Sequence, residues 1–186
     1  MSDQFYSSAS ALAELLKNKK KTPELIIVSG LSGAGKSSWC LQLARQARSL
    51  GLVVGGVISP PVFINGHKVG IDLVDQVTGE RRRLAVRLNG ARAGLKTTNW
   101  LIDPQVLAWG NQQLLGLPPC DCVILDELGP LEFSQGQGLQ AGLTLIDNHQ
   151  LPLVVTVIRP KLLPLAQKRW PWAESLLIDR ESLTER

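Results

Sequence analysis

Residues 25–37, LIIVSGLSGAGKS, join an apolar run typical of a buried strand to a glycine-rich segment. From Gly30 to Ser37 the segment fits the pattern G-x-x-x-x-G-K-[ST] at every fixed position. Glycines in this pattern allow successive backbone N–H groups to converge on phosphate oxygens, and the N-terminus of the following helix adds partial positive charge. We expect Lys36 to bridge the β- and γ-phosphates of a nucleoside triphosphate. The expected phosphate-binding residues are Gly30, Leu31, Ser32, Gly33, Ala34, Gly35, Lys36, Ser37 and Ser38.

Two adjacent acids, Asp126 and Glu127, directly follow a second apolar run, CVIL at residues 122–125. An aspartate at the end of such a strand can hold Mg²⁺ together with the hydroxyl of the phosphate-binding loop, which makes Ser37 and Asp126 the expected metal ligands. Glu127 can orient a water molecule beside the terminal phosphate and accept its proton. We therefore expect Mg²⁺ as the cofactor, and Lys36 and Glu127 as catalytic residues.

The phosphate-binding pattern alone does not define the reaction, because kinases, GTPases and ATPases share it. A nucleotide or small-molecule kinase would need a pocket for a phosphoryl acceptor, which an insertion in the sheet could form. GTPases of the Ras kind read guanine through an N-K-x-D motif, and this sequence lacks that motif. The acid pair favours hydrolysis of ATP, GTP and other nucleoside triphosphates. A nucleotide-dependent regulatory or assembly switch is the non-enzymatic alternative.

Arg159 follows a third apolar run at residues 153–158. If that strand lies between the two strands that carry the motifs, Arg159 faces the terminal phosphate and can neutralise charge in the transition state, as arginine fingers do. Lys161 is the alternative for this role, and an ordinary surface arginine before Pro160 is equally compatible with the sequence.

Tryptophan, histidine and cysteine supply fewer candidates. Trp39 and Trp109 fall in expected helices and are interpreted as core residues, whereas Trp100 or Trp172 could stack on a nucleotide base. The C-x-C pair at residues 120 and 122 has no histidine beside it, so we interpret these thiols as small buried hydrophobes rather than metal ligands.

The apolar periodicity predicts strands alternating with helices, which is typical of an α/β layered sheet. Residues 1–22 are interpreted as an N-terminal helical extension and residues 23–186 as one domain. An antiparallel β insertion is expected at about residues 60–88, because Asn65-Gly66 and Thr78-Gly79 are hairpin signals. Its basic run, residues 81–83, is expected on an exposed edge strand. Strands are expected at residues 25–29, 52–59, 121–126, 151–159 and 175–179, and helices at residues 9–20, 36–50, 104–115, 137–148 and 160–168.

The overall composition of the 186 residues is that of a globular domain, with 44% hydrophobic and 19% charged residues and a net charge of +4. The basic runs are too short for a nucleic-acid surface, so no nucleic-acid partner is expected. An apolar run of membrane-spanning length is missing, and the N-terminal charges follow the apolar turn, unlike a secretion signal. We expect a cytoplasmic protein, with the N-terminal helix or the β insertion as the surface for a protein partner.

Four segments in this order resemble the P-loop nucleoside-triphosphatases of the THEP type, a family that includes the cancer-related nucleoside-triphosphatase. They are LIIVSGLSGAGKSS, GGVISPPVFINGHKVGIDLVDQVTGERRRLA, VILDELGPLEF and LVVTVIRPKLLPLA. The resemblance covers roughly residues 25–180 and implies a P-loop NTPase three-layer sandwich with a RecA/AAA-like, mostly parallel sheet. It also implies slow Mg²⁺-dependent hydrolysis to the diphosphate and phosphate. The sequence departs from this family in its first 22 residues and at Pro60-Pro61.

Overall fold

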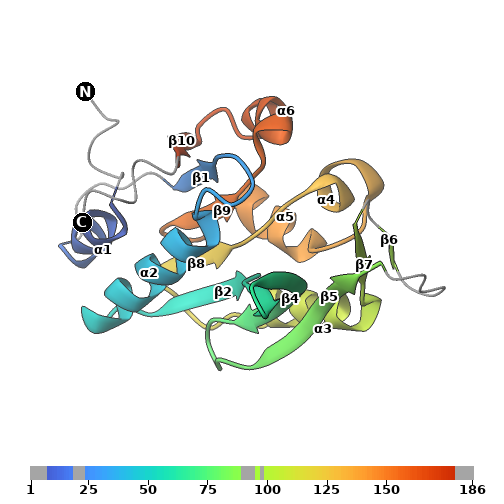
Figure 1. The fold of residues 1–186 in the computed structure, drawn as a ribbon. Helices are drawn as coiled ribbons and strands as arrows, with labels where there is room; N and C mark the ends of the chain where they lie inside the picture. Colours follow the sequence, from blue (N-terminus) through green and yellow to red (C-terminus); the bar gives the residue numbers. More distant parts are fainter. Residues whose placement is uncertain (1–7, 19–23, 89–94, 97–98, 179–186) are drawn as a thin grey trace.

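The fold is a mixed sheet whose parallel half lies between two layers of helices (Figure 1). The computed structural model describes residues 8–18, 24–88, 95–96 and 99–178. Five strands in the described chain run parallel, in the order β10-β1-β9-β8-β2. They are β1 (Leu25–Ser29), β2 (Val54–Ile58), β8 (Cys122–Leu125), β9 (Val154–Val157) and β10 (Glu174–Leu177). The carboxyl ends of parallel strands share one edge of a sheet, so the segments that follow β1, β8 and β9 meet there.

Helices cover both faces of these strands, which explains why β1, β2, β8 and β9 read as continuous apolar runs. Alternate side chains of β1 point to opposite faces, with Ile26 and Val28 on one face and Leu25 and Ile27 on the other. The first face packs against α1 (Ala9–Lys17) and α2 (Lys36–Ser49), and the second against α3 (Pro104–Leu115), α5 (Gln140–Asp147) and α6 (Leu163–Arg169). Each helix in the described part of the chain is too short or too polar to cross a bilayer.

The sheet continues beyond β2 with antiparallel strands in the order β4-β5-β7-β6. These are β4 (His67–Asp75), β5 (Arg81–Arg87), β6 (Leu95–Lys96) and β7 (Trp100–Ile102), and β3 (Pro61–Ile64) pairs with β4 outside this order. Asn65 and Gly66 join β3 to β4 with φ of 49° and 76°, the two positive angles that a type I′ hairpin turn requires. We call β3 to β5 the insertion.

Most predicted elements are confirmed, including the position of β9 between β1 and β8 and the cap of α3, where Asp103 accepts a hydrogen bond from the N–H of Gln105 at 2.8 Å. The predicted strands at residues 52–59 and 151–159 are shorter in the structure, and the helix predicted at residues 137–148 spans Gln140–Asp147. The helix α4 (Pro130–Gln135) and the strands β6 and β7 were not predicted, because they are too short to show a periodic pattern.

The prediction that residues 81–83 lie on an exposed edge is confirmed for this part of β5. Among the described residues these three pair with β4 alone, because β7 pairs only with residues 85–87. Two of the three arginines also neutralise a buried carboxylate. Arg81 and Arg83 form ion pairs with Asp72 of β4 at 3.3 and 2.5 Å, and the Asp72 side chain is only 7% exposed. The basic run therefore stabilises the pairing of β4 with β5.

The apolar stripe of α1 is already used within the domain. Ala9, Leu12 and Ala13 are fully buried in the cluster that α1 shares with α2. A partner protein would therefore meet only the polar side of this helix.

Candidate functional site

The glycine-rich loop passes from the end of β1 to the start of α2, and its glycines are required by close approach and by backbone angle. A Cβ atom on Gly30 would lie 2.2 Å from the carbonyl oxygen of Ile178, so a larger residue cannot occupy this position. Gly35, the cap of α2, has a φ of 94°, which favours glycine. The loop therefore wraps around the N-terminus of α2, where backbone N–H groups are available to an anion.

Lys36 is the first residue of α2, and its side chain folds back across the loop. Its Nζ donates hydrogen bonds to the carbonyl oxygens of Gly30 and Leu31, both at 2.8 Å, and the residue is buried. Burial lowers the pKa of Lys36, and the negative charges of Glu127 and Asp126 partly offset this effect. The lysine and the acid pair are thus electrostatic neighbours, although about ninety residues separate them in the sequence.

Asp126 connects the end of β8 to the loop. Its buried carboxylate accepts a hydrogen bond from the Ser37 side chain and another from the N–H of Ser59 at 3.3 Å. The Ser59 hydroxyl also donates to the carbonyl oxygen of Asp126. Burial raises the pKa of Asp126 to about 6, against the lowering effect of the Ser37 hydrogen bond. The structure therefore brings the two expected metal ligands into direct contact.

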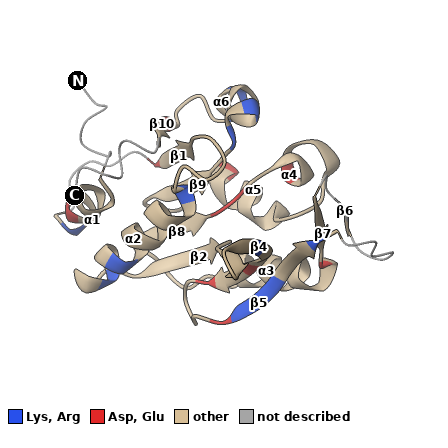
Figure 2. Cartoon of the chain, viewed as in Figure 1, with Lys and Arg blue, Asp and Glu red and all other residues tan. Residues whose placement is uncertain are grey.

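Glu127 is half-buried beside Asp126, and its carboxylate accepts a hydrogen bond from Nε of Arg159, the residue two positions beyond the end of β9. This ion pair links the ends of neighbouring strands. Lys161, the alternative to Arg159, is exposed and has no hydrogen bond or ion pair to another residue in the described part of the chain. Of these two candidates, the structure joins only Arg159 to the acid pair. Figure 2 shows negative charge at the end of β8 and positive charge at the start of α2.

Glu132 holds the segment that follows the acid pair, and the sequence interpretation missed it. Its carboxylate accepts hydrogen bonds from the N–H of Gly129 at 2.7 Å and of Leu139 at 2.8 Å. Burial raises the pKa of Glu132, and these hydrogen bonds oppose the shift. The spacing of Glu132, three residues after the cap residue Gly129, is the capping-box spacing and could have indicated this role. Ser59, which binds Asp126, had no such signal.

Oxygen ligands of the kind that Mg²⁺ prefers are present at Ser37 and Asp126. Within residues 8–18, 24–88, 95–96 and 99–178, no group of three or more His, Cys, Asp or Glu side chains could hold a metal ion. One carboxylate and one hydroxyl fit a Mg²⁺ ion that takes its remaining ligands from phosphate oxygens and water. The three cysteines are buried and unpaired, as interpreted from the sequence.

A cavity of about 560 Å³ adjoins the loop, and its lining residues include neither Asp126 nor Glu127. It lies between the loop and the end of β10, and most of its lining is apolar. Neither tryptophan that was considered for base stacking lines it. Trp172 packs 4.0 Å from the ring of His149, which lies before β9 at the opposite edge of the sheet, and Trp100 lies in β7. The cavity is lined by Gly30, Leu31, Ser32, Ala34, Pro160, Leu177 and Ile178.

The chain is similar to known proteins over most of its length. A family model described as NTPase matches residues 25–175. The nucleoside-triphosphatase THEP1 of Methanothermobacter thermautotrophicus is 34% identical over 110 residues, which cover 58% of this chain and 62% of that protein. THEP1 of Pyrococcus abyssi is 30% identical over 153 residues, which cover 77% of this chain and 80% of that protein.

Two solved structures share the fold. The solution structure of a human cancer-related nucleoside triphosphatase has a TM-score of 0.65 at 18% identity and covers 85% of this chain and 90% of its own. The crystal structure of THEP1 from Aquifex aeolicus has a TM-score of 0.58 at 18% identity and covers 87% of this chain and 99% of its own. At this identity the two structures support the fold alone. The family model, together with the match over four fifths of the Pyrococcus protein, shows that this chain belongs to the NTPase family.

Proposed function

We propose that this protein hydrolyses nucleoside triphosphates with Mg²⁺ to the diphosphate and inorganic phosphate. The observation that carries the proposal is the contact between Ser37 of the loop and Asp126 of the acid pair. This contact supports the proposal, because it brings the glycine-rich loop and the acid pair together at one edge of the sheet. The names of the THEP1 relatives support the same reaction.

In the proposed reaction the loop N–H groups and Lys36 bind the phosphates. Lys36 would exchange its two carbonyl partners for phosphate oxygens. Glu127 orients the attacking water and accepts its proton, and Arg159 neutralises charge on the transferred group. Ser37 and Asp126 would hold Mg²⁺, which supplies further charge neutralisation when bound. Positioning and electrostatic stabilisation are sufficient, because phosphoryl transfer leaves little covalent work to the protein.

The cavity beside β10 is the proposed site of the nucleoside. The acid pair follows β8, and β9 separates β8 from β1, so the terminal phosphate lies on that side of the loop. The nucleoside then extends toward β10, on the other side of β1. The largely apolar lining of the cavity offers few side-chain donors or acceptors to a base. Such a site discriminates only weakly between different bases. We therefore expect ATP, GTP, CTP and UTP all to be substrates.

Phosphate release from each of the four triphosphates, with Mg²⁺ and without any added acceptor, tests this proposal. Multiple turnovers with several bases, abolished by a chelator, are expected. Stoichiometric retention of nucleotide without phosphate release would contradict hydrolysis and support a nucleotide-dependent switch. Transfer only after an acceptor is added would support a kinase.

A further inference from the structure

The insertion reaches the same edge of the sheet as the acid pair. Strand β4 is antiparallel to β2, and their register pairs Val57 with Asp75 and Ile58 with Val74. The amino-terminal half of β4 therefore continues past the carboxyl end of β2, where it pairs with β3 instead. The ribbon has irregular register at Val62/Phe63 and Ile71/Asp72, and irregularities of this kind bend and twist a strand pair.

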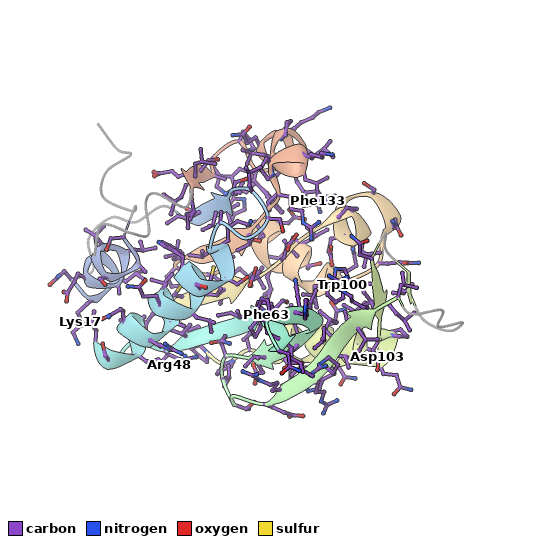
Figure 3. All side chains as sticks on the ribbon, viewed as in Figure 1. Lys17, Arg48, Phe63, Trp100, Asp103 and Phe133 are labelled. Carbon is purple, nitrogen blue, oxygen red and sulfur yellow. The ribbon has the colours of Figure 1, made fainter. Side chains whose placement is uncertain are left out.

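Lys68 lies near the start of β4, on this protruding part. Its ammonium group is 4.9 Å from the centre of the Trp100 ring, which β7 supplies. Arg87 of β5 donates a hydrogen bond to the carbonyl oxygen of Lys68 at 3.1 Å, and its guanidinium lies 5.9 Å from the same ring. Figure 3 labels Trp100 and Phe63, the partner of Lys68 in β3, in the central part of the molecule. Three strands thus hold Lys68 in place.

The ammonium of Lys68 is half-buried and is oriented by an aromatic face rather than by an acid. Within the described residues it forms no ion pair and donates no hydrogen bond. Burial lowers the pKa of Lys68. The charges that act on it are those of Glu127, Arg159, Asp126 and Arg87, in decreasing order. Three of these four belong to the candidate active site.

Lys36 and Lys68 approach the acid pair from two different parts of the fold. Among the charged groups, Glu127 has the largest effect on the pKa of both lysines. Lys36 reaches it from the glycine-rich loop and Lys68 from the insertion. In the strand order, β1 lies on one side of β8 and β4 on the other, so the two lysines come from opposite sides of the acid pair.

We propose that Lys68 is a further substrate-binding residue, whose ammonium group contacts the terminal phosphate of the bound nucleoside triphosphate opposite Lys36. The inference rests on the proposed function, since it places this phosphate beside the acid pair. An ammonium that is already partly desolvated and held by an aromatic ring loses little hydration and little conformational entropy when an anion binds. The insertion then distinguishes a triphosphate from a diphosphate.

The test compares two ligands on the variant Lys68→Met, which keeps the aliphatic stem and removes the charge. Calorimetry with Mg²⁺ measures the affinity for ADP and for the ATP analogue with nitrogen between its β- and γ-phosphates. We expect about a tenfold loss for the analogue and less than about a twofold loss for ADP, because a charged hydrogen bond to the terminal phosphate is removed. Lys68→Arg should recover part of the loss. Lys168→Met, at an exposed lysine of α6, is the matched control and should bind both ligands like the wild type.

Two outcomes would overturn the inference. In one, Lys68→Met binds both ligands like the wild type. In the other, it loses affinity for ADP and for the analogue equally, with a lowered melting temperature, which would show that Lys68 only packs against Trp100. Failure of the proposed function is a separate result, in which the wild type binds the analogue but releases no phosphate from ATP. In that case the affinities of Lys68→Met for ADP and for the analogue would still decide the role of Lys68.

Discussion

The parallel and the antiparallel halves of the sheet contribute to the site in different ways. In the parallel half, the candidate residues directly follow β1, β8 and β9, and the topology alone brings these strand ends together. In the antiparallel half, β4 runs the other way, and its amino-terminal part, which carries Lys68, extends past the carboxyl end of β2. Parallel strands therefore bring together the residues that follow them, whereas an antiparallel ribbon can bring a residue of its protruding end toward the same edge.

The two halves also treat charge differently. In the parallel half the buried Lys36 and Asp126 are hydrogen-bonded to uncharged groups, and burial shifts the pKa of the lysine down and that of the aspartate up. In the antiparallel half the buried Asp72 is paired with Arg81 and Arg83, whose side chains are well exposed. Perturbed titration is a frequent property of functional sites. We infer that the buried charges at the carboxyl edge of the parallel half serve the reaction and that most of those in the insertion serve its fold.

The largest effect is expected from Lys36→Ala in the parallel half. The variant removes a buried cation that lies across the phosphate-binding loop, so it should lose affinity for nucleotide together with activity. We expect kcat/KM to fall by about 10³-fold or more, with a nearly unchanged melting temperature. Phosphate release and calorimetry measure these quantities, and Lys168→Ala is the control. Retained nucleotide affinity in Lys36→Ala would contradict the assignment of this loop.

A smaller effect, on stability alone, is expected from Asp75→Ala at the far end of β4 from Lys68. The Asp75 carboxylate is buried and accepts hydrogen bonds from the N–H groups of Val77 and Thr78, at 3.2 and 2.9 Å, and from the Thr78 hydroxyl. Leaving these donors without their acceptor should lower the free energy of unfolding by about 1–3 kcal/mol. Urea unfolding measures the loss. Activity per folded molecule should not change. A large fall in kcat at saturating substrate would contradict the conclusion that this charge of the insertion serves only the fold.

The smallest effect is expected from Asp147→Asn, in the parallel half but at the opposite edge of the sheet. Hydrogen bonds from Arg169, and secondarily from Trp170, hold the pKa of Asp147 below its usual value. An acid whose pKa is lower in the folded state stabilises the fold above the pKa of the unfolded chain, and this stabilisation disappears as the pH falls through the folded pKa.

The wild type should therefore exceed Asp147→Asn in unfolding free energy at pH 7, and the difference should vanish under strongly acidic conditions. The Asp147 side chain is 38% exposed, so we expect only a few tenths of a kcal/mol at about pH 7. Urea unfolding across this pH range measures it. A difference that persists unchanged into acid would assign the effect to packing rather than to charge, and altered phosphate release would show that function is not confined to the other edge.

The sequence predicted the parallel half well, because its signals are local. Each buried strand reads as a continuous apolar run, and the glycine-rich loop and the acid pair directly follow such runs. The prediction that Arg159 lies beside the acid pair also required β9 to lie between β1 and β8, and the structure confirms this strand order. The catalytic and metal-binding roles of these residues stay predictions.

The residues that the sequence did not reveal depend on tertiary contacts. Lys68 resembles any lysine in an alternating strand until the ribbon brings it to Trp100, and β7, which carries Trp100, is too short to recognise by periodicity. Ser59 is a serine after a strand, and only the neighbouring β8 gives it Asp126 as a partner. The sequence also did not reveal that the second half of β5 is covered, since β7 pairs with residues 85–87 and leaves only residues 81–83 as an edge.

Glu127→Gln tests most directly whether the loop and the acid pair act on one triphosphate. The substitution keeps the size of the side chain and removes its ability to accept a proton from water. We expect Mg²⁺·ATP affinity within about threefold of the wild type and a kcat for phosphate release lower by about 10²- to 10⁴-fold. Calorimetry and a phosphate assay on the same preparation measure both. Unchanged turnover with ATP bound at normal affinity would contradict the role of Glu127 as the base and, with it, the arrangement of the site.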